Sequence, residues 1–174
     1  KDPEVEDPKP EGLYAIGAIA RIHKVWRLPD GSVRLIVQGV SRARFAEVAQ
    51  REPHLRALLQ AIEDRGDPQA MAVQAMSRSV HQQFQSMVKM LPHLPDELQI
   101  MVVNIDHPGR LSDFIASNLD LQIDEHQRLV EALEIEERLE YLTELLAREL
   151  DILEVGNQIQ TQVQEKLGKS QREH

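Results

Sequence analysis

Residues Leu13–Phe45 read Leu-Tyr-Ala-Ile-Gly-Ala-Ile-Ala-Arg-Ile-His-Lys-Val-Trp-Arg-Leu-Pro-Asp-Gly-Ser-Val-Arg-Leu-Ile-Val-Gln-Gly-Val-Ser-Arg-Ala-Arg-Phe. Two runs that suit β-strands flank a short turn sequence. In that turn, Pro29 fixes φ, Asp30 can accept a hydrogen bond from the backbone beyond it, and Gly31 tolerates a positive φ. The stretch therefore predicts an antiparallel β-hairpin.

The two faces of this hairpin differ in chemistry. On its second strand, side chains alternate between the faces, with Val33, Leu35 and Val37 on one and Arg34, Ile36 and Gln38 on the other. The hairpin is also basic, because it carries Arg21, Lys24, Arg27, Arg34, Arg42 and Arg44. We interpret these cations as the solvated face of a half-buried sheet, and binding of DNA or of acidic partners is the alternative.

The composition excludes several classes of protein. The 174 residues are 41% hydrophobic, which is enough for a core, and the net charge of −9 argues against a dedicated nucleic-acid-binding protein. There is no cysteine, so the chain forms no disulfide and no thiolate zinc site. No run approaches the roughly 18 apolar residues that a membrane span requires, so we expect no membrane partner.

Four motifs stand out along the chain: the hairpin with its Leu28-Pro29-Asp30-Gly31 turn, Asp106-x-Pro108-x-Arg110-Leu111-x-Asp113-x-Ile115-Ala116, Glu137-Arg138-Leu139-Glu140-x-Leu142, and Ser170-Gln171-Arg172-Glu173. Together they resemble the amino-terminal domain of Lon proteases, which are ATP-dependent serine proteases of the AAA+ class. They follow one another in the family order over nearly the whole chain. Family members carry more β-sequence upstream and continue into an ATPase module, so the resemblance implies a domain truncated at both ends.

We expect an α+β fold. Residues 1–64 should form an incomplete antiparallel β-lobe, and residues 67–174 a helical lobe. Residues 54–63 favour a helix by propensity, but the resemblance implies a strand there, and residues 44–52 suit either a short helix or a bent strand. Asp67 and Pro68 are expected to cap and open the first helix. Asp124 and Gln127 approximate a capping box for a later short helix.

The last helix is expected to run from about residue 135 to 170. Its leucine and isoleucine residues recur every three or four positions, which predicts one buried apolar face. Beyond Val155 the sequence becomes mostly polar, so this half either projects from the body or frays. The glutamates near its start are expected to be solvated, since negative charge is favoured at a helix N-terminus.

The sequence contains no recognisable catalytic machinery. It lacks a Gly-x-x-x-x-Gly-Lys-Ser/Thr phosphate loop, and its seven histidines have no metal-ligand spacing. We therefore predict no catalytic, cofactor-binding or metal-binding residue in this chain. ATP and Mg²⁺ are implied by the resemblance only for the parent protein, whose Ser–Lys dyad lies in a domain that this chain lacks.

Methionine supplies the candidate binding residues. Met76 and Met87 fall on the predicted core face of the first helix, whereas Met71 and Met90 fall off it. Exposed methionines suit binding of varied apolar partners. We therefore take Met71, Met90 and Trp26, which lies near the hairpin turn, as candidate substrate-binding residues.

The resemblance implies a function in substrate recognition and oligomer support. The parent would be a cytoplasmic homohexamer that degrades unfolded or damaged proteins, and the isolated fragment would hydrolyse nothing. The alternatives are a free-standing adaptor of the same fold and a nucleic-acid-binding domain. Contact with DNA is less favoured because the chain is acidic.

Overall fold

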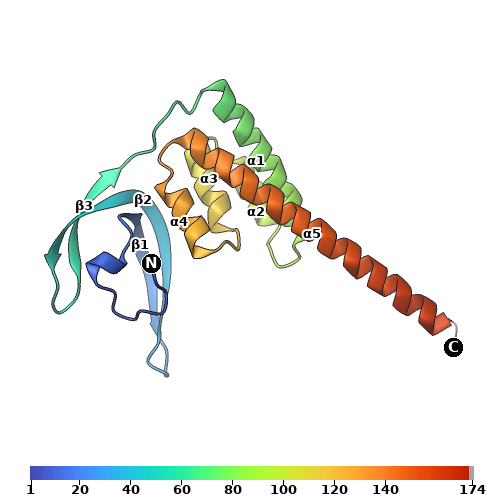
Figure 1. Ribbon diagram of the computed structural model, residues 1–174, viewed down its shortest axis with the longest axis horizontal. Coiled ribbons are helices and arrows are strands. Elements are labelled where there is room, and N and C mark those ends of the chain that lie inside the picture. The colour runs from blue at the N-terminus through green and yellow to red at the C-terminus, as the bar shows by residue number, and fades with distance from the viewer. Residues whose placement is uncertain (173–174) are drawn as a thin grey trace. The chain divides into compact units, whose positions relative to one another are not determined.

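The computed structural model describes residues 1–172, and side chains through residue 168. A short 3-10 turn (Pro10–Gly12) precedes three strands, which are β1 (Ile16–Arg27), β2 (Val33–Gln50) and β3 (Arg56–Ile62). Five helices follow: α1 (Met71–Met90), α2 (Glu97–Val103), α3 (Pro108–Ser117), α4 (Ile123–Glu131) and α5 (Ile135–Arg172) (Figure 1). The predicted α+β class is confirmed, with an antiparallel sheet in the order β1-β2-β3.

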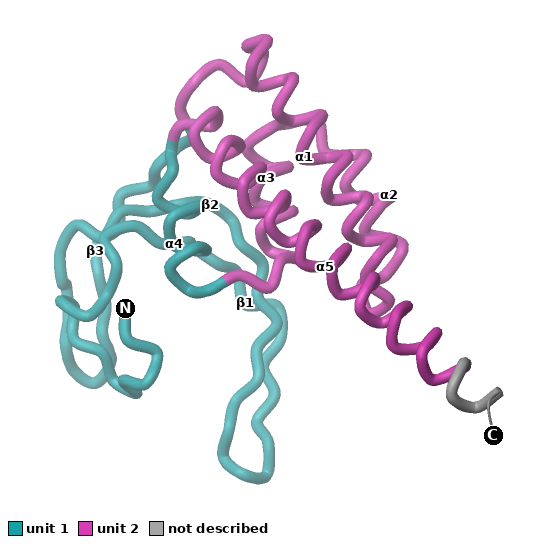
Figure 2. Tube along the Cα trace, turned by 45° about the vertical axis from the view of Figure 1, so that its right-hand side comes forward, with its two compact units in different colours: residues 1–64, 122–133 teal, residues 65–121, 134–174 magenta. Residues whose placement is uncertain are grey.

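The chain divides into two compact units (Figure 2). The first unit holds residues 1–64 and 122–133, and the second holds residues 65–121 together with the chain from residue 134 onward. The sequence placed residues 122–133 with the helices, and the structure corrects this. Helix α4 belongs to the same unit as the sheet.

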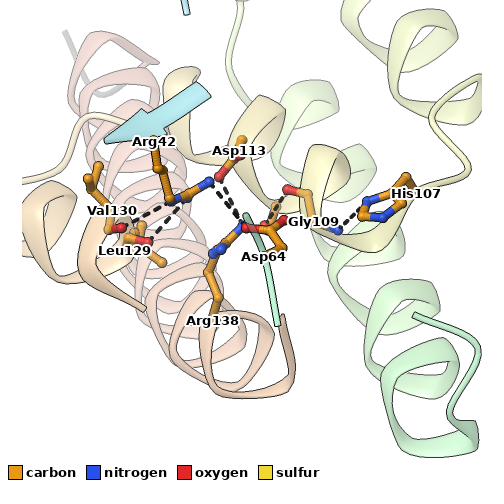
Figure 3. Close-up of polar contacts among 9 residues, drawn as sticks. Arg42, Asp64, His107, Gly109, Asp113, Leu129, Val130 and Arg138 are labelled. Carbon is orange, nitrogen blue, oxygen red and sulfur yellow. Dashed lines mark hydrogen bonds and ion pairs between the residues drawn. The ribbon is translucent and has the colours of Figure 1, made fainter. Parts of the chain in front are cut away.

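Hydrogen bonds between residues far apart in the sequence attach α4 to the sheet. The Gln127 side chain donates from Nε2 to the Ile16 carbonyl oxygen at 2.9 Å. Arg42 donates from Nε to the Val130 carbonyl at 3.0 Å, and its guanidinium also pairs with Asp64 at 3.6 Å (Figure 3). These bonds satisfy groups that would otherwise be costly to bury, which explains why α4 stays with strands more than 80 residues earlier.

The hairpin turn forms as its sequence predicts. Gly31 adopts φ +84° and donates its backbone N–H to the Leu28 carbonyl at 3.0 Å. Asp30 accepts from Ser32 twice, from the hydroxyl at 2.6 Å and from the backbone N–H at 2.8 Å. The hydroxyl bond, followed by the backbone bond, lowers the pKa of Asp30 below its usual value, because both favour the carboxylate.

The rest of the sheet contains two segments for which the sequence left both helix and strand open. Residues 44–50 continue β2, with shifts of register between Phe45 and Glu47 and between Val48 and Gln50, so the bent strand is the correct alternative. Residues 56–62 form β3 against them, as the family resemblance implied and helix propensity did not. Cross-strand pairing outweighs the propensity of this leucine- and alanine-rich run.

Two helix starts differ from the sequence expectation. Helix α1 begins at Met71 rather than beside Asp67, whose carboxylate instead accepts from the Gln69 N–H at 2.8 Å in the preceding turn. Helix α4 begins earlier than predicted, since the Gln122 N–H donates to Glu125 Oε2 at 3.0 Å. The capping box thus lies two residues before the predicted one.

The core of the second unit lies between α1, α3 and α5. Its fully buried residues include Val80, Phe84, Ile115, Leu139, Leu142 and Leu146. Arg138 is also buried, at 1% exposure, and it reaches Asp113 at 3.4 Å (Figure 3). Helix α5 starts at Ile135 as expected and stays helical to Arg172, past the other helices of its unit (Figure 1). Glu173 of the predicted end motif lies outside the described residues.

Candidate functional site

The outer part of the β1–β2 hairpin forms a ribbon that is exposed on both faces. The pairs Ile22↔Val37, Val25↔Leu35 and Arg27↔Val33 lie on one face, because directly paired residues point to the same side of a sheet. The pairs Arg21↔Gln38, Lys24↔Ile36 and Trp26↔Arg34 lie on the other. A shift of register between Ile22 and Lys24 places His23 as an extra residue and keeps the two sets apart.

The first of these faces is aliphatic. Its five apolar side chains remain between 50% and 58% exposed: Ile22, Val25, Val33, Leu35 and Val37. We name this set the aliphatic face. Burial in the strands occurs near the other end of the hairpin, at Ile16 and Ala43, where Gln127 and Arg42 attach α4. The core of this unit therefore stops short of the ribbon, and the aliphatic face stays open to solvent.

The opposite face is cationic. Arg21, Lys24 and Arg34 are exposed there, beside Trp26 and Ile36. The ammonium of Lys24 lies 5.1 Å from the centroid of the Trp26 ring, a cation–π arrangement. We name Arg21, Lys24, Trp26 and Arg34 the cationic face. The interpretation of the sheet as half-buried is wrong for this region, because neither face of the ribbon is covered.

The structure does not gather the three predicted site residues within one unit. Met71 is 89% exposed at the first position of α1, and Met90 is half-buried at the last position of the same helix. A helix rises 1.5 Å per residue, so these two methionines are about 28 Å apart. Trp26 is 39% exposed and belongs to the other unit. Met71 is exposed, as its position off the predicted core face implied, and the aliphatic face was not among the predicted site residues.

Two further groups of exposed apolar residues lie in the second unit. Helix α2 exposes Ile100, Met101 and Val103 by 52% to 68%. The outer half of α5 carries five aliphatic side chains at steps of three or four residues, each 50% to 60% exposed: Ile152, Val155, Ile159, Val163 and Leu167. These spacings put them on one side of the helix. We name this set the α5 stripe.

Within residues 1–168, whose side chains the structure describes, no group of three or more His, Asp or Glu is arranged to hold a metal ion. No helix of the described chain is long and apolar enough to cross a membrane.

Comparison with known proteins gives the family. The profile described as "ATP-dependent protease La (LON) substrate-binding domain" matches residues 1–148. This chain belongs to the LON substrate-binding domain family. The adaptor and nucleic-acid-binding alternatives are not favoured by that match.

Relatives of this LON domain extend well beyond it. The chain is 41% identical over 170 residues to a Lon protease of Dictyoglomus thermophilum, covering 98% of this chain and 21% of the relative. It is 40% identical over 175 residues to a Lon protease of Heliobacterium modesticaldum, again covering 21% of the relative. The chain therefore spans about a fifth of the length of the curated relatives that it matches.

Solved structures share the fold of this LON domain. The amino-terminal domain of a Mycobacterium avium complex Lon protease superposes with a TM-score of 0.65 at 22% identity, over 81% of this chain and 75% of that one. A Lon amino-terminal domain protein from Xanthomonas campestris gives a TM-score of 0.50 at 19% identity, over 80% and 71%. The predicted relationship to Lon amino-terminal domains is confirmed.

Proposed function

We propose that this chain recognises polypeptide substrates for a Lon-type ATP-dependent protease, and that the aliphatic face of the hairpin makes the first contact. The observation that carries this proposal is the set of five aliphatic side chains, half or more exposed, on one face of a ribbon. The description of the family as a substrate-binding domain supports it.

The physical basis is burial of apolar surface. Each Å² of apolar area removed from water contributes about 25 cal/mol, so a ribbon face of this size gives weak, reversible binding to exposed apolar segments. Unfolded or damaged proteins expose such segments, whereas folded proteins bury them. Several copies of the domain in one assembly would raise the effective concentration of binding sites and so retain a substrate that a single copy releases.

Site-specific photo-crosslinking tests this placement. A photoreactive residue at Leu35, on the aliphatic face, should label a reduced and alkylated protein that cannot refold. The matched control is Leu58 of β3, which is 56% exposed in the same unit. Equal or stronger labelling from position 58 would show that exposure alone, and not the aliphatic face, determines contact.

Met71 is proposed as a second and separate contact. At 89% exposure it can bury most of its thioether side chain against a partner, whereas half-buried Met90 can add less. Trp26 remains a candidate through the opposite face of the ribbon. The three residues are therefore proposed to act independently, and Met71→Ser and Trp26→Ser should have additive effects on substrate binding.

The α5 stripe is proposed to support assembly with other copies of the chain. A line of five half-exposed aliphatic residues on a long helix resembles the seam of a helix pair. The homohexamer implied for the parent protein would use this surface. Ile159→Asp should lower the self-association measured by analytical ultracentrifugation, and an unchanged sedimentation profile in a self-associating sample would argue against it.

We propose that the chain has no catalytic activity of its own, and that ATP and Mg²⁺ act in other parts of a Lon protease. We also propose a cytoplasmic location, which the absence of cysteine suits. ATP hydrolysis or peptide cleavage that co-purifies with the chain and disappears when it unfolds would contradict the first point. Cell fractionation tests the second.

A further inference from the structure

The cationic face of the ribbon concentrates charge in an acidic protein. Residues 16–44 hold six of the 20 lysines and arginines and only one of the 29 acidic residues. Arg21, Lys24 and Arg34 are exposed, and none of them forms an ion pair within the described part of the chain. These cations are therefore free to pair with an external ligand.

We propose that the cationic face binds an extended polypeptide segment that carries carboxylates at alternate positions. This site is distinct from the aliphatic face and lies on the reverse of the same two strands. It adds a preference for acidic segments to the apolar binding proposed above. The choice of a polypeptide as the ligand rests in part on that proposed function.

The spacing of the cations fits such a segment. Side chains on one face of a strand repeat every two residues, which is about 6.8 Å. An extended peptide has the same repeat, so its alternate carboxylates can align with successive pairs along the ribbon. Two of these pairs, Lys24↔Ile36 and Trp26↔Arg34, each contribute one cation and one apolar side chain. The methylene and Cβ groups of the peptide can pack on Trp26 and Ile36 while its carboxylates reach the cations.

Part of the site is ordered before binding. Lys24 lies over the Trp26 ring at 5.1 Å, and this contact restrains a side chain that is otherwise costly to immobilise. His23 bonds through Nε2 to the Gln38 amide oxygen at 2.9 Å, and Gln38 pairs with Arg21 across the strands. This hydrogen bond restrains the Gln38 side chain, which lies beside Arg21.

Charge favours an acidic peptide over a nucleic acid. Specific nucleic-acid-binding proteins commonly make about six to ten phosphate contacts, whereas this face offers three cations. The net charge of −9 also repels a long polyanion at distances up to a Debye length, about 8 Å at physiological salt. A short segment with three or four carboxylates can contact the three cations while it stays away from most of the acidic residues elsewhere in the chain.

Fluorescence anisotropy with the whole chain tests the proposal. The probe is a labelled peptide of alternating glutamate and serine, compared with a block peptide of the same composition and with a lysine–serine peptide. The alternating acidic peptide should bind most tightly, and its affinity should fall as salt rises. The double variant Lys24→Glu/Arg34→Glu should weaken it about tenfold or more and should gain affinity for the lysine peptide.

Matched controls separate this site from its surroundings. Arg51→Glu reverses an exposed cation of the same unit that lies outside the ribbon, and it should change acidic-peptide binding little. Leu35→Ser alters only the aliphatic face, so it should reduce binding of an apolar unfolded protein and leave the acidic peptide unaffected. If the proposed function is wrong, the chain should not bind the apolar unfolded protein. If this inference is wrong, the chain should not bind the acidic peptide.

Three outcomes would overturn the proposal. The block peptide could bind as tightly as the alternating one, which would exclude the extended register. Arg51→Glu could weaken binding as much as the double variant, which would indicate general attraction. A single-stranded oligonucleotide of similar charge could bind more tightly and displace the peptide, which would make this a nucleic-acid surface.

Discussion

Val25 and Leu35 face each other across β1 and β2, and each keeps about half of its side chain exposed, 51% and 50% respectively. A two-stranded ribbon with this much apolar surface in water is marginally stable by itself. Its order must come from the end of the hairpin at which the strands join a core. The bonds from Arg42 and Gln127 lie at that end.

Arg42→Ala should destabilise the sheet unit. The change removes three contacts: the bond to the Val130 carbonyl, the longer bond to the Leu129 carbonyl at 3.4 Å, and the ion pair with Asp64. A hydrogen bond from a charged group contributes about 1.5–3 kcal/mol, so loss of the short bond to Val130 alone should cost about that much. Urea unfolding or hydrogen exchange at α4 measures it. Arg44→Ala, at the exposed neighbouring arginine, should stay within about 0.5 kcal/mol. Similar losses in both variants would show that Arg42 does not anchor α4.

Ser32→Ala should raise the pKa of Asp30 toward its usual value. The Ser32 hydroxyl is the main cause of the lowered pKa, and the backbone N–H bond that remains should keep part of the shift. In the native chain, the ionised carboxylate stabilises the turn at a pH above the usual aspartate pKa. That stabilisation is lost as the pH falls through the lowered value. NMR titration of the carboxyl carbon measures both values, and an unchanged pKa in the variant would be inconsistent with the hydroxyl bond.

Leu142→Ala should cost about 2–5 kcal/mol of unfolding free energy, because Leu142 is fully buried between helices. Ile159→Ala, on the outer half of the same helix, should cost far less, because Ile159 is 56% exposed. Urea unfolding at low protein concentration compares the two. Equal losses would indicate that the outer half of α5 is packed against another chain.

The sequence predicted the elements that rest on local chemistry. The hairpin follows from its Pro-Asp-Gly turn and its alternation, and the buried side of α5 follows from its apolar period. The strand at residues 56–62 needed the family resemblance, since local propensity favoured a helix. The assignment of α4 to the sheet could not be predicted from local pattern. It depends on Arg42 and Gln127, whose partners lie 88 and 111 residues away.

The candidate site was only partly predictable for a similar reason. Alternation predicted that Val33, Leu35 and Val37 share a face, but it could not show that nothing in this unit covers that face. Alternating apolar residues normally mark the buried side of a sheet, so this face was expected to be covered. The methionines of α1 that fall off its core face were therefore the candidates for exposed apolar residues. Met71 is exposed as expected, but its separation from Met90 depends on where the helix begins and ends.

Affinity for a permanently unfolded protein tests the central claim most directly. The unmodified chain should bind a reduced and alkylated protein in 0.5 M salt nearly as well as in low salt, because screening weakens only the Coulombic part of binding. Leu35→Asp should weaken that binding about tenfold, as expected for losing the burial of half a leucine side chain. Leu58→Asp in β3 should have little effect, with both variants folded by circular dichroism. If salt abolishes binding while Leu35→Asp leaves it unchanged, the aliphatic face is not the substrate contact and the account is wrong.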